Sequence, residues 1–162
     1  MDGYVLRDAP GWTFKASGAE NDGRYDLLVI NDLAYATGPP LHVHATQEDT
    51  FFCLEGVLTV QLGDEVAELG PGDFATAPPG VAHSFTNAYA EQPVCRSLNL
   101  LTPGNGFDRY LDRLEEVAAS GDAEEMDRLN AQFGVTVVGP SLADRLGLAT
   151  QASPWSGPAS IR

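Results

Sequence analysis

A chain of 162 residues, 43% of them hydrophobic, is long enough for one well-buried core, and this length favours one domain over two. Nine basic residues against 23 acidic ones give a formal net charge of −14, which repels phosphate backbones and anionic lipids, so we expect neither nucleic acid nor a membrane as partner. No run approaches the ~20 apolar residues of a membrane helix, and residues 1–10 lack the features of a secretion signal, so we expect a cytoplasmic protein.

The first two thirds of the chain has the pattern of an all-β protein. Between residues 12 and 101, short apolar or β-branched runs alternate with turn residues: RYDLLVI, LAYATG, DTFFCLEGVLTVQL, AELGPGDFATAPPG, AHSFTN and PVCRSLNLL. Many short strands at close spacing are typical of a sandwich or a barrel. The residues Gly63-Asp64-Glu65 predict a tight hairpin between two of these strands. Cys53 and Cys95 lie in β-like runs without an export signal, so we expect buried, reduced thiols.

The period of the apolar residues changes after Leu101. From Phe107 to Ala118 they recur at helical spacing with acidic residues between them, which predicts an amphipathic helix. Asp122 with Glu125 resembles a capping box that opens a second helix, and Gly134 ends that helix. We therefore expect residues 104–150 to form a helical extension packed on the barrel or on a partner subunit. Residues 151–162 are rich in Ser, Pro, Gly and Ala and predict an irregular tail.

The three histidines of the chain all fall within two short β-rich segments, LHVHATQED and PPGVAHSFTN. Residues two apart in a strand face the same side, so His42 and His44 present neighbouring imidazoles. Alone, such a pair is as consistent with a structural role as with half of a metal site. His83 follows a turn rich in Gly and Pro, where a returning strand would enter the same barrel, and this favours a metal site. Imidazole suits Fe, Ni, Mn, Cu and Zn, and a carboxylate from Glu48 or Asp49 would complete the ligand set.

Together the two segments resemble the paired motifs of the cupin superfamily. The first motif runs His-x-His, three or four residues, Glu, six residues and Gly, and the matching residues are His42, His44, Asp49 and Gly56, with Asp in place of Glu. The second runs Gly, five residues, Pro-x-Gly, two residues, His, three residues and Asn, and the matching residues are Gly72, Pro78, Gly80, His83 and Asn87. The resemblance covers residues 38–87 by motif and 12–103 by strand pattern.

This resemblance implies a double-stranded β-helix, or jelly-roll, barrel over residues 1–103, commonly as a homodimer. It also implies that the matched histidines and the carboxylate bind one divalent metal in the mouth of the barrel. Asp49 has the register of the motif but is shorter than Glu by one C–C bond of ~1.5 Å, so it reaches a metal only after a small backbone shift or through water. Glu48 is one residue off register, and strand alternation turns it to the opposite face unless the chain bulges. We favour Asp49 as the ligand, with Glu48 as a substitute or a second acid–base group, and a site of three histidines alone stays open.

Strand alternation also predicts which side chains surround the site. Phe51 and Cys53 share a face with Asp49, and Phe85 shares a face with His83. These residues either line a dry cavity suited to an aromatic or hydrophobic small molecule or simply fill the barrel. On a later strand, Asn99 is placed to offer a polar contact to a bound molecule.

Among cupins, the strand ending in Thr-Pro before a helix, LLTPGNGFDRYLDRL, resembles the quercetin 2,3-dioxygenase-like subgroup. The resemblance implies a metal-dependent dioxygenase acting on an aromatic or enolisable small molecule, in which Asp49 or Glu48 accepts the proton of an enol or phenol. Two alternatives stay open: a non-redox isomerase or polyketide-type cyclase, and a small-molecule-binding cupin without turnover. The chain has no Gly-x-Ser-x-Gly motif, phosphate-binding loop or dinucleotide fingerprint, which argues against serine-nucleophile and nucleotide chemistry.

Overall fold

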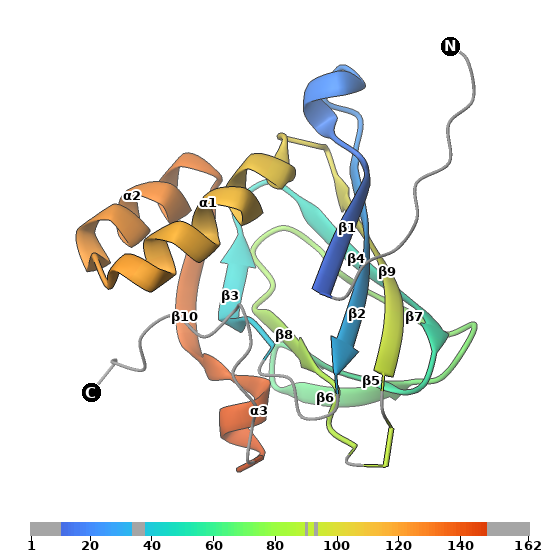
Figure 1. Ribbon diagram of the computed structural model, residues 1–162. Helices are drawn as coiled ribbons and strands as arrows, with labels where there is room; N and C mark the ends of the chain where they lie inside the picture. Colours follow the sequence, from blue (N-terminus) through green and yellow to red (C-terminus); the bar gives the residue numbers. More distant parts are fainter. Residues whose placement is uncertain (1–10, 34–37, 90, 93, 149–162) are drawn as a thin grey trace.

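The computed structural model describes residues 11–33, 38–89, 91–92 and 94–148 (Figure 1). Over these residues, ten strands form two five-stranded sheets, and all strand pairs are antiparallel. The first sheet has the order β1 (Gly11–Ala16), β2 (Asp26–Leu33), β9 (Val94–Thr102), β4 (Glu48–Glu55) and β7 (Phe74–Ala77). The second has the order β10 (Val135–Ser141), β3 (Pro40–His44), β8 (His83–Thr86), β5 (Leu58–Leu62) and β6 (Glu65–Leu69). This arrangement confirms the predicted jelly roll, and the predicted hairpin is the turn between β5 and β6.

Side chains alternate between the two faces of each strand, and this alternation decides which of them fill the interior between the two sheets. In β9, buried and half-buried residues alternate over the whole strand, and the buried ones are Cys95, Ser97, Asn99 and Leu101. A period of two is what a strand with one buried face requires. The same period in β4 buries Asp49, Phe51 and Cys53, and Phe51 packs against Phe85 of the opposite sheet, with ring centroids 5.2 Å apart. Cys53 and Cys95 are buried and are not joined by a disulfide, as expected.

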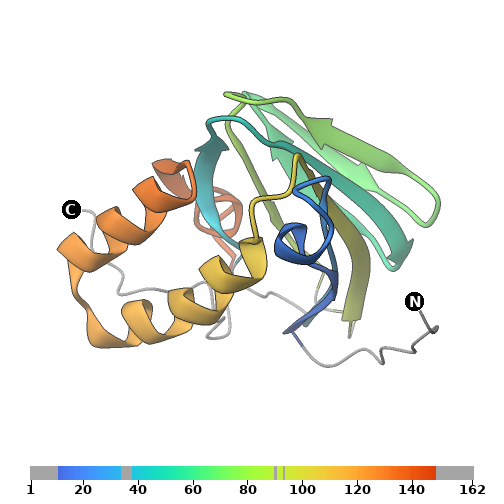
Figure 2. The ribbon, with the colours of Figure 1, turned by 90° about the horizontal axis from the view of Figure 1, so that it is seen from above.

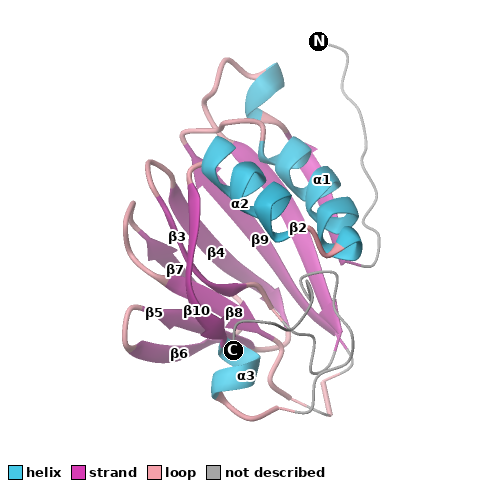
Figure 3. Cartoon of the chain, turned by 90° about the vertical axis from the view of Figure 1, so that its left-hand side faces the viewer, coloured by secondary structure: helices cyan, strands magenta, loops and turns pink. Residues whose placement is uncertain are grey.

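Two helices pack side by side across one flank of the barrel (Figures 2 and 3). The first is α1 (Phe107–Ser120) and the second is α2 (Ala123–Gln132), as the helical spacing predicts. Asp122 caps α2 by accepting a hydrogen bond of 3.0 Å from the backbone N–H of Glu125. Side chains of both helices join the barrel residues Leu28 and Ile30 in one hydrophobic core. Within the described residues, no helix has the length and apolar character that crossing a bilayer requires.

The segment after α2 differs from the predicted helical extension. Residues 135–141 form strand β10, which pairs with β3 and adds an edge strand to the second sheet, and the short helix α3 (Leu142–Arg145) follows. The β-branched run Val135-Thr136-Val137-Val138 favours a strand over a helix. Part of the extension therefore belongs to the barrel itself. The predicted tail, residues 151–162, lies outside the described residues.

A buried carboxylate fixes where α1 begins. Asp26 is fully buried, and its Oδ1 and Oδ2 accept hydrogen bonds of 2.6 and 2.9 Å from the backbone N–H groups of Gly18 and Asn105. These contacts join the β1–β2 connection to the β9–α1 connection. The two connections pass so closely that a Cβ on Gly18 would lie 2.6 Å from the backbone carbon of Gly104, which explains a glycine at this position.

Replacing Asp26 with Asn tests this tie. The variant keeps the shape of the side chain but places an N–H donor against a backbone donor. We expect Asp26→Asn to lower the free energy of unfolding by about 2–3 kcal/mol, as for loss of a buried hydrogen bond to a charged group. Urea unfolding at neutral pH measures the change, and Glu20→Gln, at an exposed position of the same connection, is expected to stay within ~0.5 kcal/mol of the unaltered protein. Equal stability of both variants would contradict the assigned role.

Candidate metal centre

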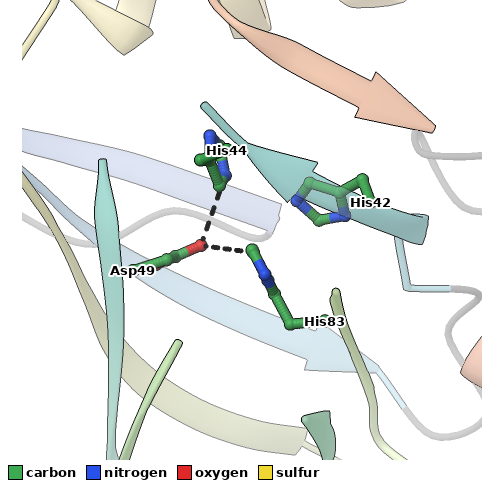
Figure 4. Close-up of side chains that lie close together, drawn as sticks. All are labelled: His42, His44, Asp49 and His83. Carbon is green, nitrogen blue, oxygen red and sulfur yellow. Dashed lines mark ion pairs between the residues drawn. The ribbon is translucent and has the colours of Figure 1, made fainter. Parts of the chain in front are cut away.

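Four side chains from three strands converge in the interior of the barrel (Figure 4). His42 and His44 come from β3, His83 from the neighbouring β8, and Asp49 from β4 in the opposite sheet. Their possible ligand atoms all lie within 4.8 Å of one another, and each residue is at most 8% exposed. His42 and His83 are direct partners across β3 and β8, with ring centroids 4.3 Å apart. A group of this composition and spacing could hold one metal ion.

The two candidate carboxylates lie on opposite faces of β4. Asp49 points inward, and its Oδ2 lies 3.2 Å from Nε2 of His83 and 3.6 Å from Nε2 of His44. Glu48 is half-buried, pairs with Thr102 on β9 and is not part of the group. The strand continues without a bulge between these two residues, so alternation decides which of them faces the histidines. The structure therefore brings Asp49, and not Glu48, to the three imidazoles.

Backbone carbonyls fix the orientation of two of the imidazoles. Nδ1 of His42 donates to the carbonyl of Pro40 at 2.8 Å, and Nδ1 of His83 donates to the carbonyl of Val81 at 2.9 Å. A proton on Nδ1 leaves the lone pair on Nε2, which is the tautomer that a metal requires. In both histidines the accepting carbonyl lies two residues earlier in the chain, so local backbone geometry sets the orientation of the ring.

The remaining ring nitrogens show why the group fits a cation. Among the described residues, three buried ring nitrogens have no hydrogen-bond partner: Nδ1 and Nε2 of His44 and Nε2 of His83. Nε2 of His83 lies near Asp49 but without the alignment of a hydrogen bond, which suits two groups that share an ion. A buried polar group without a partner costs about 1–3 kcal/mol. A cation bound to both Nε2 atoms would remove that cost at these two atoms.

Burial and mutual contact shift the protonation of the group. Burial, together with the neighbouring His83 and His44, lowers the pKa of His42 to about 3, so this ring is neutral at pH 7. Burial alone would raise the pKa of Asp49, but its contacts with His44 and His83 outweigh burial and lower that pKa. Burial alone would lower the pKa of His83, but the contact with Asp49 outweighs burial and raises it. Asp49 is thus held as a carboxylate, ready to pair with positive charge.

Aromatic rings and an amide surround the four residues. The ring of Phe107, at the start of α1, lies 5.5 Å from the ring of His44, and the ring of Phe51 lies 6.1 Å from that of His83. Asn99, which the sequence predicts to offer a polar contact to a bound molecule, donates from Nδ2 to Oδ1 of Asp49. Cys53 lies further along β4, where its thiol donates to the backbone carbonyl of Gly56 at 3.5 Å. The surroundings of the group are thus largely apolar, with one amide directed at the carboxylate.

Comparisons with known proteins agree with this fold. The family model described as "Cupin domain" matches residues 32–95, which include all four residues of the group. Residues 32–95 of this chain therefore carry a cupin domain. A 63-residue segment of this cupin is 32% identical to a quercetin 2,3-dioxygenase of Bacillus subtilis (strain 168), which is 39% of this chain and 18% of that protein.

Two solved structures are similar to this cupin in fold. KdgF from Halomonas sp. has a TM-score of 0.51 and 19% identity, over 58% of this chain and 78% of that one. An uncharacterized protein with a double-stranded β-helix domain from Klebsiella pneumoniae has a TM-score of 0.50 and 22% identity, over 64% of this chain and 86% of that one. At these identities the likeness concerns the fold alone.

Two residues that contact the site lie outside the matched segment of this cupin. Phe107 belongs to the helical stripe in the sequence, and its distance from His44 depends on how α1 packs. Asn99 is separated from Asp49 by 50 positions, and neither cupin motif includes it. The alternation along β9, which turns Asn99 inward, is the one sequence pattern that indicates its contact with the carboxylate.

The lowered pKa of His42 predicts acid sensitivity of the metal-free protein. The pKa in the folded state is about 3, below the unfolded value near 6.5, so the unfolded chain binds the proton more readily and stability falls as pH falls from 6.5. Between pH 6.5 and 4.5 we expect His42 to contribute a loss of about 2 kcal/mol. The lowered pKa of Asp49 changes the stability only below pH 3.8, the ordinary pKa of an aspartate. The raised pKa of His83 changes the stability only above pH 6.5, the ordinary pKa of a histidine.

Urea unfolding at the two pH values in the presence of a chelator measures this loss. His42→Gln removes the titrating group, so its stability is expected to change less with pH than that of the unaltered protein. Parallel losses in both proteins would show that His42 does not cause the acid sensitivity.

Proposed function

We propose that this cupin is a metal-dependent dioxygenase acting on an aromatic or enolisable small molecule. The observation that carries the proposal is the convergence of three imidazoles and one carboxylate, with buried ring nitrogens that have no partner among the described residues. The partial likeness to a quercetin 2,3-dioxygenase supports the reaction class. In this proposal, His42, His44, Asp49 and His83 hold one divalent ion.

The donor set suits several metals. Imidazole and carboxylate bind Fe, Mn, Ni, Cu and Zn, and four protein ligands leave one or two positions free on a five- or six-coordinate ion. When bound, the metal would supply Lewis-acid polarisation of a substrate oxygen and, if redox-active, access to dioxygen chemistry. The backbone carbonyls of Pro40 and Val81 hold His42 and His83 in the tautomer that such an ion requires.

The protonation state of Asp49 bears on the substrate class. Its Oδ1 accepts a hydrogen bond from Asn99, so Oδ2 would offer one lone pair to the ion and the other to a proton from a substrate hydroxyl. Because the pKa of Asp49 is lowered, this carboxylate is a weak base. A weak base accepts a proton more readily from an acidic hydroxyl, such as an enol or a phenol, than from an alcohol. The lowered pKa of Asp49 therefore favours enols and phenols as substrates.

The apolar surroundings restrict water at the site. Phe51 and Phe85 are each at most 3% exposed, and Phe107 is 6% exposed. Rings at these positions suit an aromatic or hydrophobic substrate and strengthen electrostatic interactions within the site. We propose that Phe107 contacts the substrate from the helical side.

Metal content tests the ligand assignment. We expect the unaltered protein, reconstituted with one divalent metal and then desalted, to retain about one equivalent per chain. His83→Ala removes one ligand and is expected to retain far less, because a missing ligand leaves an incomplete site. Circular dichroism of both proteins serves as the control for folding. Equal and negligible metal in the two folded proteins would contradict the proposed metal site.

Oxygen consumption tests the reaction class. With Fe, Ni, Mn or Zn reconstituted in turn, we expect consumption of dioxygen on a panel of flavonols and diketones with at least one redox-active metal, and none with His83→Ala. Turnover that proceeds without dioxygen would instead favour an isomerase or cyclase. Binding of panel compounds without any product would favour a cupin without turnover.

A further inference from the structure

Asn99 is a buried residue whose side-chain nitrogen donates hydrogen bonds to two groups of the neighbouring strand β4. It is 4% exposed, on the inward face of β9, and pairs with Phe51 of β4. Its Nδ2 donates to Oδ1 of Asp49 and, at 3.3 Å, to the backbone carbonyl of Thr50. An amide nitrogen has two N–H groups, so both are directed to β4. The carboxylate of Asp49 is thereby tied to the backbone of its own strand.

Because of the hydrogen bond from Asn99, the two carboxylate oxygens of Asp49 have different partners. Oδ1 is taken by the amide of Asn99, whereas Oδ2 lies 3.2 Å from His83 and 3.6 Å from His44. A carboxylate that turned to offer both oxygens to one ion would have to break the bond to Asn99. The geometry therefore favours binding of an ion through Oδ2 alone.

We propose that Asn99 is a positioning residue that holds Asp49 as a ligand with a single coordinating oxygen. This inference rests on the proposed metal site. An aspartate is shorter than the glutamate of the cupin motif, so fewer of its conformations reach an ion shared with three histidines. Fixing the short side chain in the conformation that reaches the ion reduces the entropy lost on binding. Use of one oxygen also keeps one more coordination position open than use of two.

Binding of Co²⁺ tests the role of Asn99, because its visible absorption reports the number and geometry of ligands. Asn99→Leu keeps the approximate size of the side chain and removes both donors. We expect Co²⁺ to bind about 10–100-fold more weakly to this variant, the usual cost of losing a group that orients a ligand. We also expect a changed absorption spectrum, because the carboxylate becomes free to turn. Asn99→Ser, whose side chain is too short to reach Asp49, tests the same tie should the leucine variant not fold.

A matched control separates positioning from packing. Ser97 lies on the same strand and face as Asn99 and is 1% exposed, but it is not in the four-residue group. Ser97→Ala is expected to leave the affinity and the spectrum of Co²⁺ unchanged. In an Asp49→Ala background, Asn99→Leu is expected to weaken binding no further, because its effect passes through the carboxylate.

The outcomes distinguish this inference from the proposed function. Failure of the unaltered protein to bind Co²⁺ would overturn both. If the unaltered protein binds Co²⁺ but the variants at position 99 show the same affinity and spectrum, the positioning role is wrong and the metal site stands. An equal loss of affinity in the Asp49→Ala background would likewise overturn the positioning role.

Discussion

Three imidazoles and one carboxylate are buried together between the two sheets of the barrel. The histidines come from one sheet and Asp49 from the other, so the group joins the two halves of the barrel across its interior. Without a cation, both ring nitrogens of His44 have no hydrogen-bond partner among the described residues, whereas Nε2 of His83 has Oδ2 of Asp49 nearby, at 3.2 Å. A buried polar atom without a partner costs about 1–3 kcal/mol, and binding of a cation would relieve that cost at Nε2 of His44.

The helical flank is connected to this group through a polar network. Gln47, two residues before Asp49, donates to the carbonyl of Pro103 at 3.0 Å and accepts from Nδ2 of Asn105 at 3.2 Å. Nδ2 of Asn105 also lies 3.2 Å from the carbonyl of Phe133, and its backbone N–H donates to Asp26. The connection that starts α1, and so places Phe107 beside His44, is thus bound to the strand that carries the carboxylate. Substitutions in this network are expected to disturb the site as well as the helices.

The sequence alone predicts those features that depend on local spacing. The two-residue period places His42 and His44 on one face and separates Asp49 from Glu48, and the Gly- and Pro-rich turn before His83 indicates where the third imidazole enters. The helical period likewise predicts α1 and α2. Strand β10 is the exception, because its β-branched run is short and Gly139-Pro140 interrupts the pattern.

Local sequence patterns do not predict which residues of distant segments contact one another. Asn99 meets Asp49 because β9 pairs with β4, and this pairing is decided by the whole first sheet rather than by either strand. Phe107 meets His44 only because α1 packs on the flank of the barrel. Strand alternation therefore indicates that Phe51 and Asn99 face the interior, but the particular groups that they contact there require the tertiary structure.

X-ray absorption of the protein reconstituted with one equivalent of Zn²⁺ tests whether the three imidazoles and the carboxylate share one ion. Coordination by His42, His44, His83 and Asp49 predicts a first shell of nitrogen and oxygen at roughly 2.0–2.2 Å, with the outer-shell scattering that imidazole rings produce. A shell of oxygen alone, without imidazole scattering, would contradict the account.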